Sequence, residues 1–226
     1  MSIQRTVAIK SLRPIKLNRP GHILFRSWAR LYRSRFPYQE LAPLPAIAKS
    51  LEQEESEILG LIDSRSNQLA GFTLVEFYQS STLLAYLATA PDYEGQGLAR
   101  MLINQQLAIH LTEKTPYFFL EANPKLWSFY TKLGFYRIDL DYQIPEFYGA
   151  GTEKMGLFVR LHCSQEKLPK SVVETFVSEV FLSGYELKKN AGLGYVNVLE
   201  KNLVKLKEEK AVAKVMKDED DLEESE

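Results

Sequence analysis

Two glycines, Gly95 and Gly97, lie where a binding site for an anion can form. An apolar run ends at Ala90-Pro91-Asp92, the glycines follow, and a stretch of helical period then begins. The first backbone N–H groups of a helix have no acceptor inside the helix, and glycine lets a phosphate approach them closely. The spacing therefore predicts a phosphorylated ligand between Glu94 and Arg100, although glycines at a turn can also serve the turn alone.

A second group of residues follows at residues 120–135. A short apolar stretch leads to Asn123, which can cap a helix that begins at Pro124. Tyr130 lies on that helix, and Gly134 is suited to end it. The order is thus a glycine turn, a helix, a strand and a second helix that carries a Phe-Tyr pair.

In this order the two motifs resemble those of the GCN5-related N-acetyltransferase (GNAT) superfamily, in a bacterial-type member. Glu94-Gly95-Gln96-Gly97-Leu98-Ala99 is similar to the acetyl-CoA motif Arg/Gln-x-x-Gly-x-Gly/Ala. Asn123 through Phe135 is similar to the second motif, Asn-x-x-Ala-x-x-Phe-Tyr-x-x-x-Gly-Phe. The resemblance covers roughly residues 4–162, and two motifs in register are more specific than either alone.

The resemblance implies acetyl-CoA as a co-substrate. The backbone N–H groups at the glycine turn would bind its pyrophosphate, and the edge of the preceding strand would pair with its pantetheine arm. Asn123 could instead be only a helix cap, and Arg100 only a solvated helix residue. The residues expected to bind the cofactor are Leu87, Ala88, Thr89, Gln96, Gly97, Leu98, Ala99, Arg100, Asn123 and Tyr130.

The implied reaction is direct attack of a neutral amine on the thioester in a ternary complex, without a covalent enzyme intermediate. A backbone N–H would stabilise the oxyanion before the CoA thiolate leaves. Tyr130 matches the family tyrosine that often protonates this thiolate, which a phenol of pKa about 10 can do. The alternative is that Tyr130 only packs against Phe135.

The chain departs from the family pattern at two places. Glu94 stands where the family prefers Arg or Gln, and a carboxylate beside a pyrophosphate is unfavourable unless it points away. Ala85 or Tyr86 stands where some relatives carry a glutamate as base. Glu76 and Glu121 are therefore weak candidates for a catalytic base, each with a solvent-facing or paired carboxylate as the alternative.

Other reactive side chains suggest no further chemistry. His22, His110 and His162 are scattered and form no metal-ligand pattern, so we expect no metal. Cys163 lies outside both motifs, and a single cysteine excludes an intramolecular disulfide.

Hydrophobic periodicity predicts the elements that position these residues. The predicted strands are 4–12, 57–62, 69–78, 82–89, 117–121, 135–140 and 154–161, and the predicted helices are 20–35, 46–51, 96–112 and 124–133. A polar cluster at 63–67 predicts a hairpin turn. On helix 96–112 the predicted core stripe is Leu98, Met101, Leu102, Ala108 and Ile109.

The resemblance implies an α/β fold of the GNAT type. Its central mixed, mostly antiparallel sheet would have about seven strands and a splayed parallel pair at 82–89 and 117–121, flanked by helices. Residues 1–163 would form this domain. Residues 164–210 are expected to be a helical extension packed on it, and 211–226 an acidic disordered tail.

Two apolar stripes support the helical extension. One consists of Val172, Val173, Phe176 and Val180, and the other of Leu199, Leu203 and Leu206. We expect them to pack on the main domain because short isolated helices are marginal in water. A homodimer surface is the alternative.

Composition limits the class of protein. Residues 217–226 carry seven acids and one lysine, a net charge of −6, which leaves +5 for the rest of a chain with a net charge of −1. That surplus is too small to indicate nucleic acid as a partner. No apolar run is long enough for a transmembrane helix and the first residues lack a signal-peptide core, so we expect no membrane partner and a cytoplasmic location.

The sequence thus predicts an acetyl-CoA-dependent N-acetyltransferase acting on a primary amine in a small molecule or peptide. The acceptor pocket would come from residues 20–53 and from a hairpin at 141–153. The alternative is a catalytically weak acyl-CoA-binding module with a regulatory or interaction role.

Overall fold

The computed structural model describes residues 11–148, 151–185 and 215–216. The chain divides into two compact units. The first comprises Met1–Phe77 and Thr82–Thr112, and the second comprises Tyr78–Ser81 and Glu113–Glu226. Strands and flanking helices occur in both units, so the predicted α/β class is confirmed.

Antiparallel strands form the centre of the first unit, in the order β1-β2-β3-β4. They are β1 (Leu12–Leu17), β2 (Ser56–Asp63), β3 (Gln68–Phe77) and β4 (Ser81–Thr89). The predicted hairpin between β2 and β3 is confirmed. In its turn, Asp63 Oδ1 accepts a hydrogen bond from the N–H of Arg65 at 2.9 Å, and Asn67 adopts a φ of 57°.

The first described strand lies later in the chain than the sequence predicts. Most of the strand predicted at 4–12 falls outside the described residues, whereas β1 starts at Leu12 and its last residue, Leu17, pairs with Ile58. Within β1 only Leu17 is buried. Pro14 is tolerated because an edge strand does not need every N–H for a ladder. The weak apolar alternation of this edge strand explains why the sequence did not predict it.

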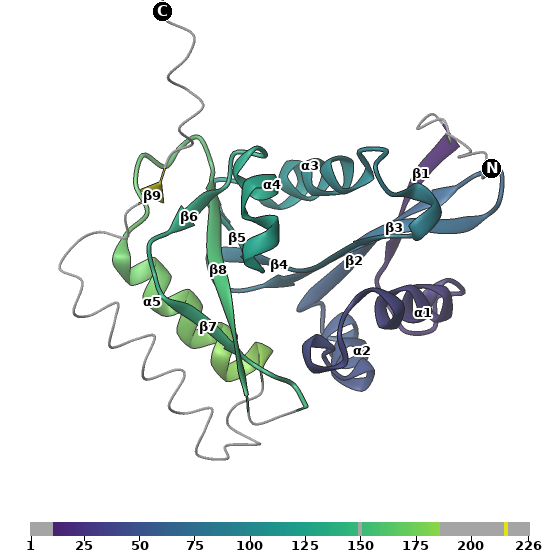
Figure 1. Ribbon diagram of the computed structural model, residues 1–226, viewed down its shortest axis with the longest axis horizontal. Coiled ribbons are helices and arrows are strands. Elements are labelled where there is room, and N and C mark those ends of the chain that lie inside the picture. Colours follow the sequence, from purple (N-terminus) through teal and green to yellow (C-terminus); the bar gives the residue numbers. More distant parts are fainter. Residues whose placement is uncertain (1–10, 149–150, 186–214, 217–226) are drawn as a thin grey trace, which may run out of the picture. The chain divides into compact units, whose positions relative to one another are not determined.

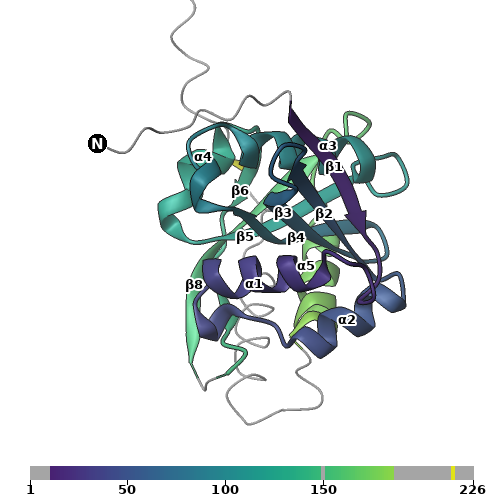
Figure 2. The ribbon, with the colours of Figure 1, turned by 90° about the vertical axis from the view of Figure 1, so that its right-hand side faces the viewer.

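Helices cover both faces of these strands. On one face lie α1 (Phe25–Arg35), the 3₁₀ turn η2 (Tyr38–Glu40) and α2 (Leu44–Glu52), while η3 (Pro91–Tyr93) and α3 (Leu98–His110) lie on the other. Figures 1 and 2 show α1 and α2 on the opposite side of the strands from α3. The core on the α1 face includes a stack of Trp28 on Tyr32 with ring centroids 5.2 Å apart.

Helix α3 turns a different face to the core than the predicted stripe. Leu98 and Leu102 are buried as predicted, but the other buried residues of α3 are Ile103 and Gln106. Ala108 and Ile109 are exposed and Met101 is half-buried. Gln106 tolerates burial because its Nε2 donates a hydrogen bond to Thr73 Oγ1 at 2.7 Å.

A β-bulge interrupts β4. Tyr86 pairs with Leu74 of β3 whereas Leu84 pairs with Val75, so Ala85 is an extra residue in the ladder. Ala85 and Tyr86 consequently both pack toward the α1 face of the strands. The bulge places an irregular piece of backbone in the strand that leads to the glycine turn.

The second unit has its own strands. β8 (Thr152–Leu161) pairs antiparallel with β5 (Tyr117–Ala122), β6 (Tyr136–Ile138) and β7 (Tyr142–Pro145). β6 also pairs with β9 (Val215–Met216), which falls within the predicted acidic tail. The turn η4 (Pro124–Leu126) and helix α4 (Trp127–Thr131) connect β5 to β6, and Gly134 follows with a φ of 75°.

Helix α5 (Lys170–Glu179) and the π-helical turn η5 (Val180–Gly184) follow β8. Val173, Phe176 and Val180 of the predicted apolar stripe are buried. The ring of Phe176 stacks on Phe119 of β5 with centroids 3.9 Å apart. The second stripe, at Leu199, Leu203 and Leu206, lies outside the described residues.

Among the described residues, the helices include none with the length and apolar character that crossing a membrane requires.

Candidate functional site

The backbone of the glycine turn is open on its outer side. Gly95 and Gly97 have φ values of 72° and 80°, in the left-handed region that favours glycine. A Cβ atom added at either position would meet no atom within 4 Å. The turn therefore needs glycine for its conformation, and it leaves room for a ligand to approach the backbone.

The N-terminus of α3 presents unpaired backbone donors. Gly97 is the N-cap and offers no side chain to cap the helix. The first backbone hydrogen bond into the helix runs from the N–H of Met101 to the oxygen of Gly97, at 3.1 Å. The N–H groups of Leu98, Ala99 and Arg100 come before it and have no acceptor within the helix. No acid lies in the first turn to oppose an anion.

The turn is anchored on both sides. Tyr93 is buried, and its hydroxyl donates to Asp63 Oδ2 at 3.1 Å, which ties η3 to the β2–β3 hairpin. Gln96 Nε2 donates to the backbone oxygen of Asp92 at 3.0 Å. Gln96 Oε1 is enclosed and has no hydrogen-bond partner among the described residues. The donors of the turn are thus held in place before any ligand binds.

Glu94, at the entrance of the turn, forms an ion pair with Arg35 from the last turn of α1. The side chains of Arg35 and Glu94 are 31% and 50% exposed, so both can still be reached by a ligand. Sequence spacing could not reveal this pair because its members lie 59 residues apart.

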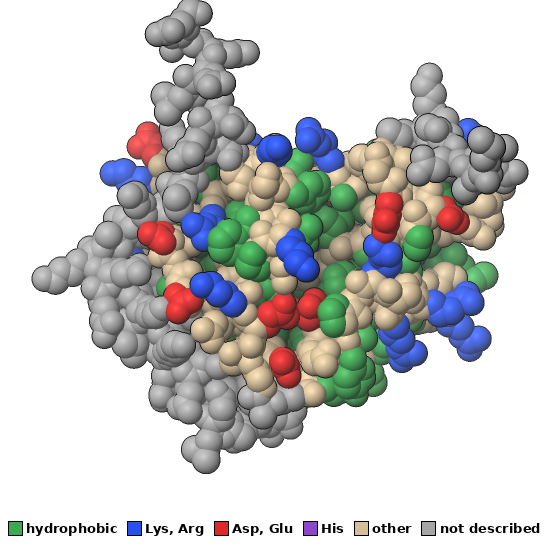
Figure 3. Space-filling model, viewed as in Figure 1, with side chains coloured by type: hydrophobic (Ala, Val, Ile, Leu, Met, Phe, Trp, Pro, Cys, Tyr) green, Lys and Arg blue, Asp and Glu red, His purple; other side chains and the backbone are tan. Residues whose placement is uncertain are grey.

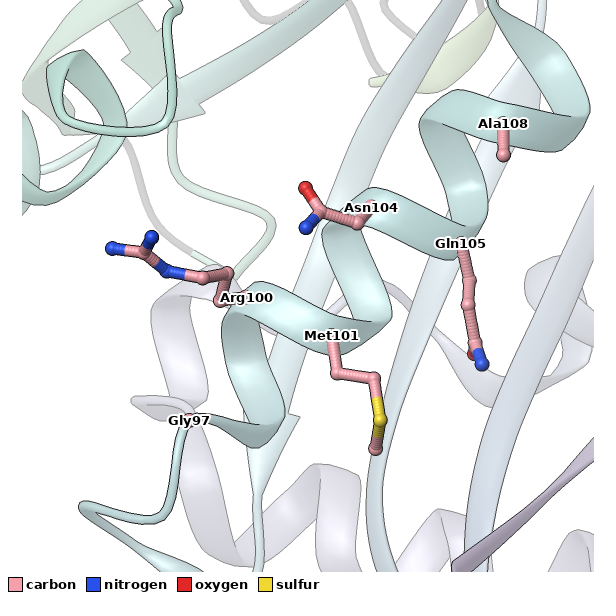
Figure 4. Close-up of a pocket in the computed structure, with 6 residues that line it drawn as sticks. All are labelled: Gly97, Arg100, Met101, Asn104, Gln105 and Ala108. Atoms are coloured by element: carbon pink, nitrogen blue, oxygen red, sulfur yellow. The ribbon is translucent and has the colours of Figure 1, made fainter. Parts of the chain in front are cut away.

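A pocket of about 410 Å³ extends from Gly97 along α3 (Figure 4). Met101 and Gln105 extend alongside each other from successive turns of the helix in that view. The Gln105 Oε1 atom is enclosed without a hydrogen-bond partner among the described residues. The residues that line the pocket are Gly97, Arg100, Met101, Asn104, Gln105 and Ala108. The helical spacing of these residues after the glycine turn is the sequence signal that could have predicted a pocket on this face of α3. Hydrophobic periodicity instead assigns Met101 and Ala108 to the core.

The predicted pantetheine-binding residues Leu87, Ala88 and Thr89 form the last part of β4. They pair with Thr73, Phe72 and Gly71 of β3. Ala88 is buried, whereas Leu87 and Thr89 are half-buried. This part of β4 therefore leads from the bulge directly to the glycine turn.

Tyr86 has a structural role. Its hydroxyl donates to the backbone oxygen of Glu40 at 2.7 Å and accepts from the N–H of Ala42 at 3.0 Å. Burial raises the pKa of Tyr86 well above its usual value. These contacts fix the segment between α1 and α2 to β4.

Asn123 lies in the second unit, at the end of β5. Its Oδ1 accepts a hydrogen bond from the N–H of Lys125 at 3.2 Å, so the predicted helix cap is present. Its Nδ2 donates to Glu153 Oε1 at 3.2 Å. The geometry satisfies the capping role, and contact with a cofactor stays a prediction.

Tyr130 is buried on α4, 6% exposed, and burial raises its pKa above the usual value for a phenol. Phe129, Phe135 and Phe158 surround its ring with centroids 5.1 to 6.1 Å away. A phenol of raised pKa stays protonated and can act as a hydrogen-bond donor. The packing alternative is present, and the proton-donor role stays a prediction.

The two candidate bases differ in their surroundings. Both carboxylate oxygens of Glu121 accept hydrogen bonds, one from Tyr142 at 2.5 Å and the other from Tyr185 at 2.7 Å. Hydrogen bonds to both oxygens stabilise the ionised form and weaken it as a proton acceptor. Glu76 is half-buried on β3, and its charge contributes to the raised pKa of Tyr86.

A buried carboxylate with two basic partners lies in the first unit. Glu57 of β2 is 3% exposed and pairs with Lys16, and its Oε1 lies 3.5 Å from His110 Nε2. Burial alone would raise the pKa of Glu57, but the hydrogen bonds and charges of His110 and Lys16 outweigh it and lower the pKa. Within the described chain, no cluster of three or more His, Cys, Asp or Glu side chains is arranged to hold a metal.

Comparison with known proteins places these features in a family. Residues 25–135 match the model of the acetyltransferase (GNAT) family, and no curated protein sequence matches the chain.

Solved structures of the same fold include a GNAT-family protein from Bacteroides thetaiotaomicron. It has 17% identity and a TM-score of 0.59, with 76% of this chain and 98% of that chain covered. Another is a spermidine N-acetyltransferase from Vibrio cholerae in complex with CoA and spermine. It has 19% identity and a TM-score of 0.54, with 68% of this chain and 96% of that chain covered. At these identities the likeness establishes the fold.

Proposed function

The chain belongs to the GCN5-related N-acetyltransferase (GNAT) superfamily, and on that basis we propose that it transfers an acetyl group from acetyl-CoA to a primary amine by direct attack. The observation that carries the proposal is the glycine turn, where a Cβ at Gly95 or Gly97 would meet open space and the first N–H groups of α3 have no acceptor within the helix. Family membership supports acetyl-CoA as the phosphorylated ligand of this turn.

The residues present fit that co-substrate. The N–H groups of Leu98, Ala99 and Arg100, with the turn at Gln96 and Gly97, would hold the pyrophosphate. The pocket along α3 offers space for the nucleotide end, and its volume lies in the usual range for ligand sites. Leu87, Ala88 and Thr89 would pair with the pantetheine arm as an added strand.

Acetyl-CoA would supply the activated acetyl group and a thiolate leaving group. The bulge at Ala85 frees backbone groups of β4 from the regular ladder. One freed N–H could donate to the oxyanion as the amine attacks. Tyr130 would donate a hydrogen bond to the departing sulfur, as the matching tyrosine of the second motif implies.

Glu76 and Glu121 both stay candidate bases. Both oxygens of Glu121 are engaged by tyrosine hydroxyls, which favours a fixed negative charge over proton uptake. A fixed carboxylate could instead orient Tyr142 and Tyr185. An amine that enters the site in its neutral form would need no strong base.

The acceptor is a primary amine in a small molecule or peptide. A structural relative acts on spermidine, which makes polyamines the first class to test. A homodimer stays a prediction that light scattering can test.

Release of free thiol tests the proposal. The full chain is incubated with acetyl-CoA and spermidine, a lysine-containing peptide or a peptide with a free N-terminus, and free CoA is titrated. Cys163 is exposed and would itself react with a thiol reagent, so Cys163→Ser is the assay background. Thiol release with at least one amine supports acetyl transfer. Tight CoA binding without release on any amine would support the binding-module alternative instead.

A further inference from the structure

The glycine turn carries an acidic residue at the first position of the acetyl-CoA motif. The motif prefers Arg or Gln there, and this chain has Glu94. An uncompensated carboxylate at this position would repel a pyrophosphate that carries negative charge. The carboxylate must therefore be neutralised or point away if the turn is to bind this ligand well.

Arg35 neutralises this carboxylate from another element. It lies in the last turn of α1 and pairs with Glu94. The end of α1 is fixed on β4, because the ring of Phe36 packs on Tyr86 with centroids 5.0 Å apart and Tyr32 packs on Tyr86 at 4.8 Å. The packing of α1 on β4 thus places the Arg35 guanidinium beside Glu94, at the entrance of the glycine turn.

Helix α1 is also cationic as a whole. It carries arginines at 26, 30, 33 and 35 and no acidic residue. Figure 3 shows Lys and Arg side chains gathered over this helix. Arg35 is the member of this set that pairs with the carboxylate beside the glycines, and its side chain remains 31% exposed.

We propose that Arg35 binds the pyrophosphate of CoA, supplying from α1 the cation that the motif lacks at position 94, while Glu94 holds the guanidinium in place. This inference rests on the proposed function. A guanidinium has several donors in a planar fork, so Arg35 can contact Glu94 and a phosphate oxygen together. Arg35 is then a cofactor-binding residue that lies outside both motifs.

Calorimetric titration of CoA into the full chain tests this role. Arg35→Gln should weaken CoA binding about tenfold, the effect of losing one charge-assisted hydrogen bond at a partly exposed site. Glu94→Gln should change the affinity by less than about threefold. The double variant Arg35→Gln/Glu94→Gln should bind CoA several-fold better than Arg35→Gln alone, because it has no unpaired carboxylate at position 94. Arg33→Gln, two residues away on the same helix end, is the matched control and should bind like the wild type.

The reversed pair separates charge recognition from support of the fold. Arg35→Glu with Glu94→Arg puts arginine at the motif position and should bind CoA within about threefold of the wild type. Turnover with S-acetylpantetheine, which has no phosphates, should be unchanged by Arg35→Gln. The role of Arg35 would be overturned if Arg35→Gln lost as much turnover with S-acetylpantetheine as with acetyl-CoA. It would also be overturned if the reversed pair bound CoA as weakly as Arg35→Gln. Absence of CoA binding by the wild type would instead overturn the proposed function.

Discussion

Replacing Gly97 with alanine should separate backbone strain from ligand exclusion at the turn. Gly97 has a φ of 80°, and the added Cβ would meet no protein atom within 4 Å. The substitution thus creates no clash inside the protein. It forces a side-chain-bearing residue into the left-handed region and puts a methyl group where we propose that the pyrophosphate lies.

The strain has a calculable effect on stability. A residue other than glycine in the left-handed region costs about 1–2 kcal/mol. For a chain of this size each kcal/mol lowers the melting temperature by about 2–4 °C, so the expected loss is about 2–8 °C. The methyl group should weaken CoA binding by about thirtyfold, which corresponds to about 2 kcal/mol for a lost hydrogen bond to a charged ligand.

Gly95→Ala is the matched control. Gly95 has a φ of 72° and equally empty surroundings, but it lies outside the residues proposed to bind the pyrophosphate. Thermal unfolding should show similar losses for both variants, and calorimetry should show a large loss of CoA affinity only for Gly97→Ala. Equal losses of affinity, or unchanged affinity in Gly97→Ala, would refute the placement of the pyrophosphate at the start of α3.

Three further predictions follow from other residues. Tyr130→Phe should lower kcat by at least about tenfold with little change in CoA affinity, and unchanged turnover in steady-state assays would remove Tyr130 as proton donor. Because the pKa of Glu57 is lowered in the fold, its contribution to stability is present above the unfolded pKa and is lost as pH falls through the folded pKa. Urea unfolding should therefore show that the free energy of unfolding falls less between pH 7 and pH 4 in Glu57→Gln than in the wild type. An equal fall in both would contradict the role of Lys16 and His110. Cys163→Ser should leave amine acetylation unchanged, and a loss would show that the thiol takes part.

The sequence predicted the local elements of the site well because they depend on local signals. The glycines at 95 and 97 and the cap at Asn123 act through backbone conformation and hydrogen bonds within a few residues. Positive φ values and a cap bonded to Lys125 are found at these positions. Such features can be predicted without knowing what packs against them.

The face of α3 and the partner of Glu94 required knowledge of the tertiary structure. Gln106 is polar, so hydrophobic periodicity does not predict it on the buried face of α3. It is buried because Thr73, 33 residues away, accepts its hydrogen bond. Arg35 resembles any solvated helix arginine until α1 is packed on β4. Contacts between distant residues decide both cases, and a single sequence carries no signal for them.

The bulge in β4 matters for how this chain is compared with others and mutated. From Ala85 to Thr89 half-buried and buried residues alternate, whereas Ser81 through Leu84 are all buried. An alignment that treats the strand as uninterrupted would assign one half of it to the wrong face. Deletion of Ala85 should remove the bulge and keep the register, because Leu84 and Tyr86 already pair with the consecutive residues Val75 and Leu74. A relative that lacks this residue would thus differ in backbone geometry beside the proposed thioester site, even if all of its side chains matched.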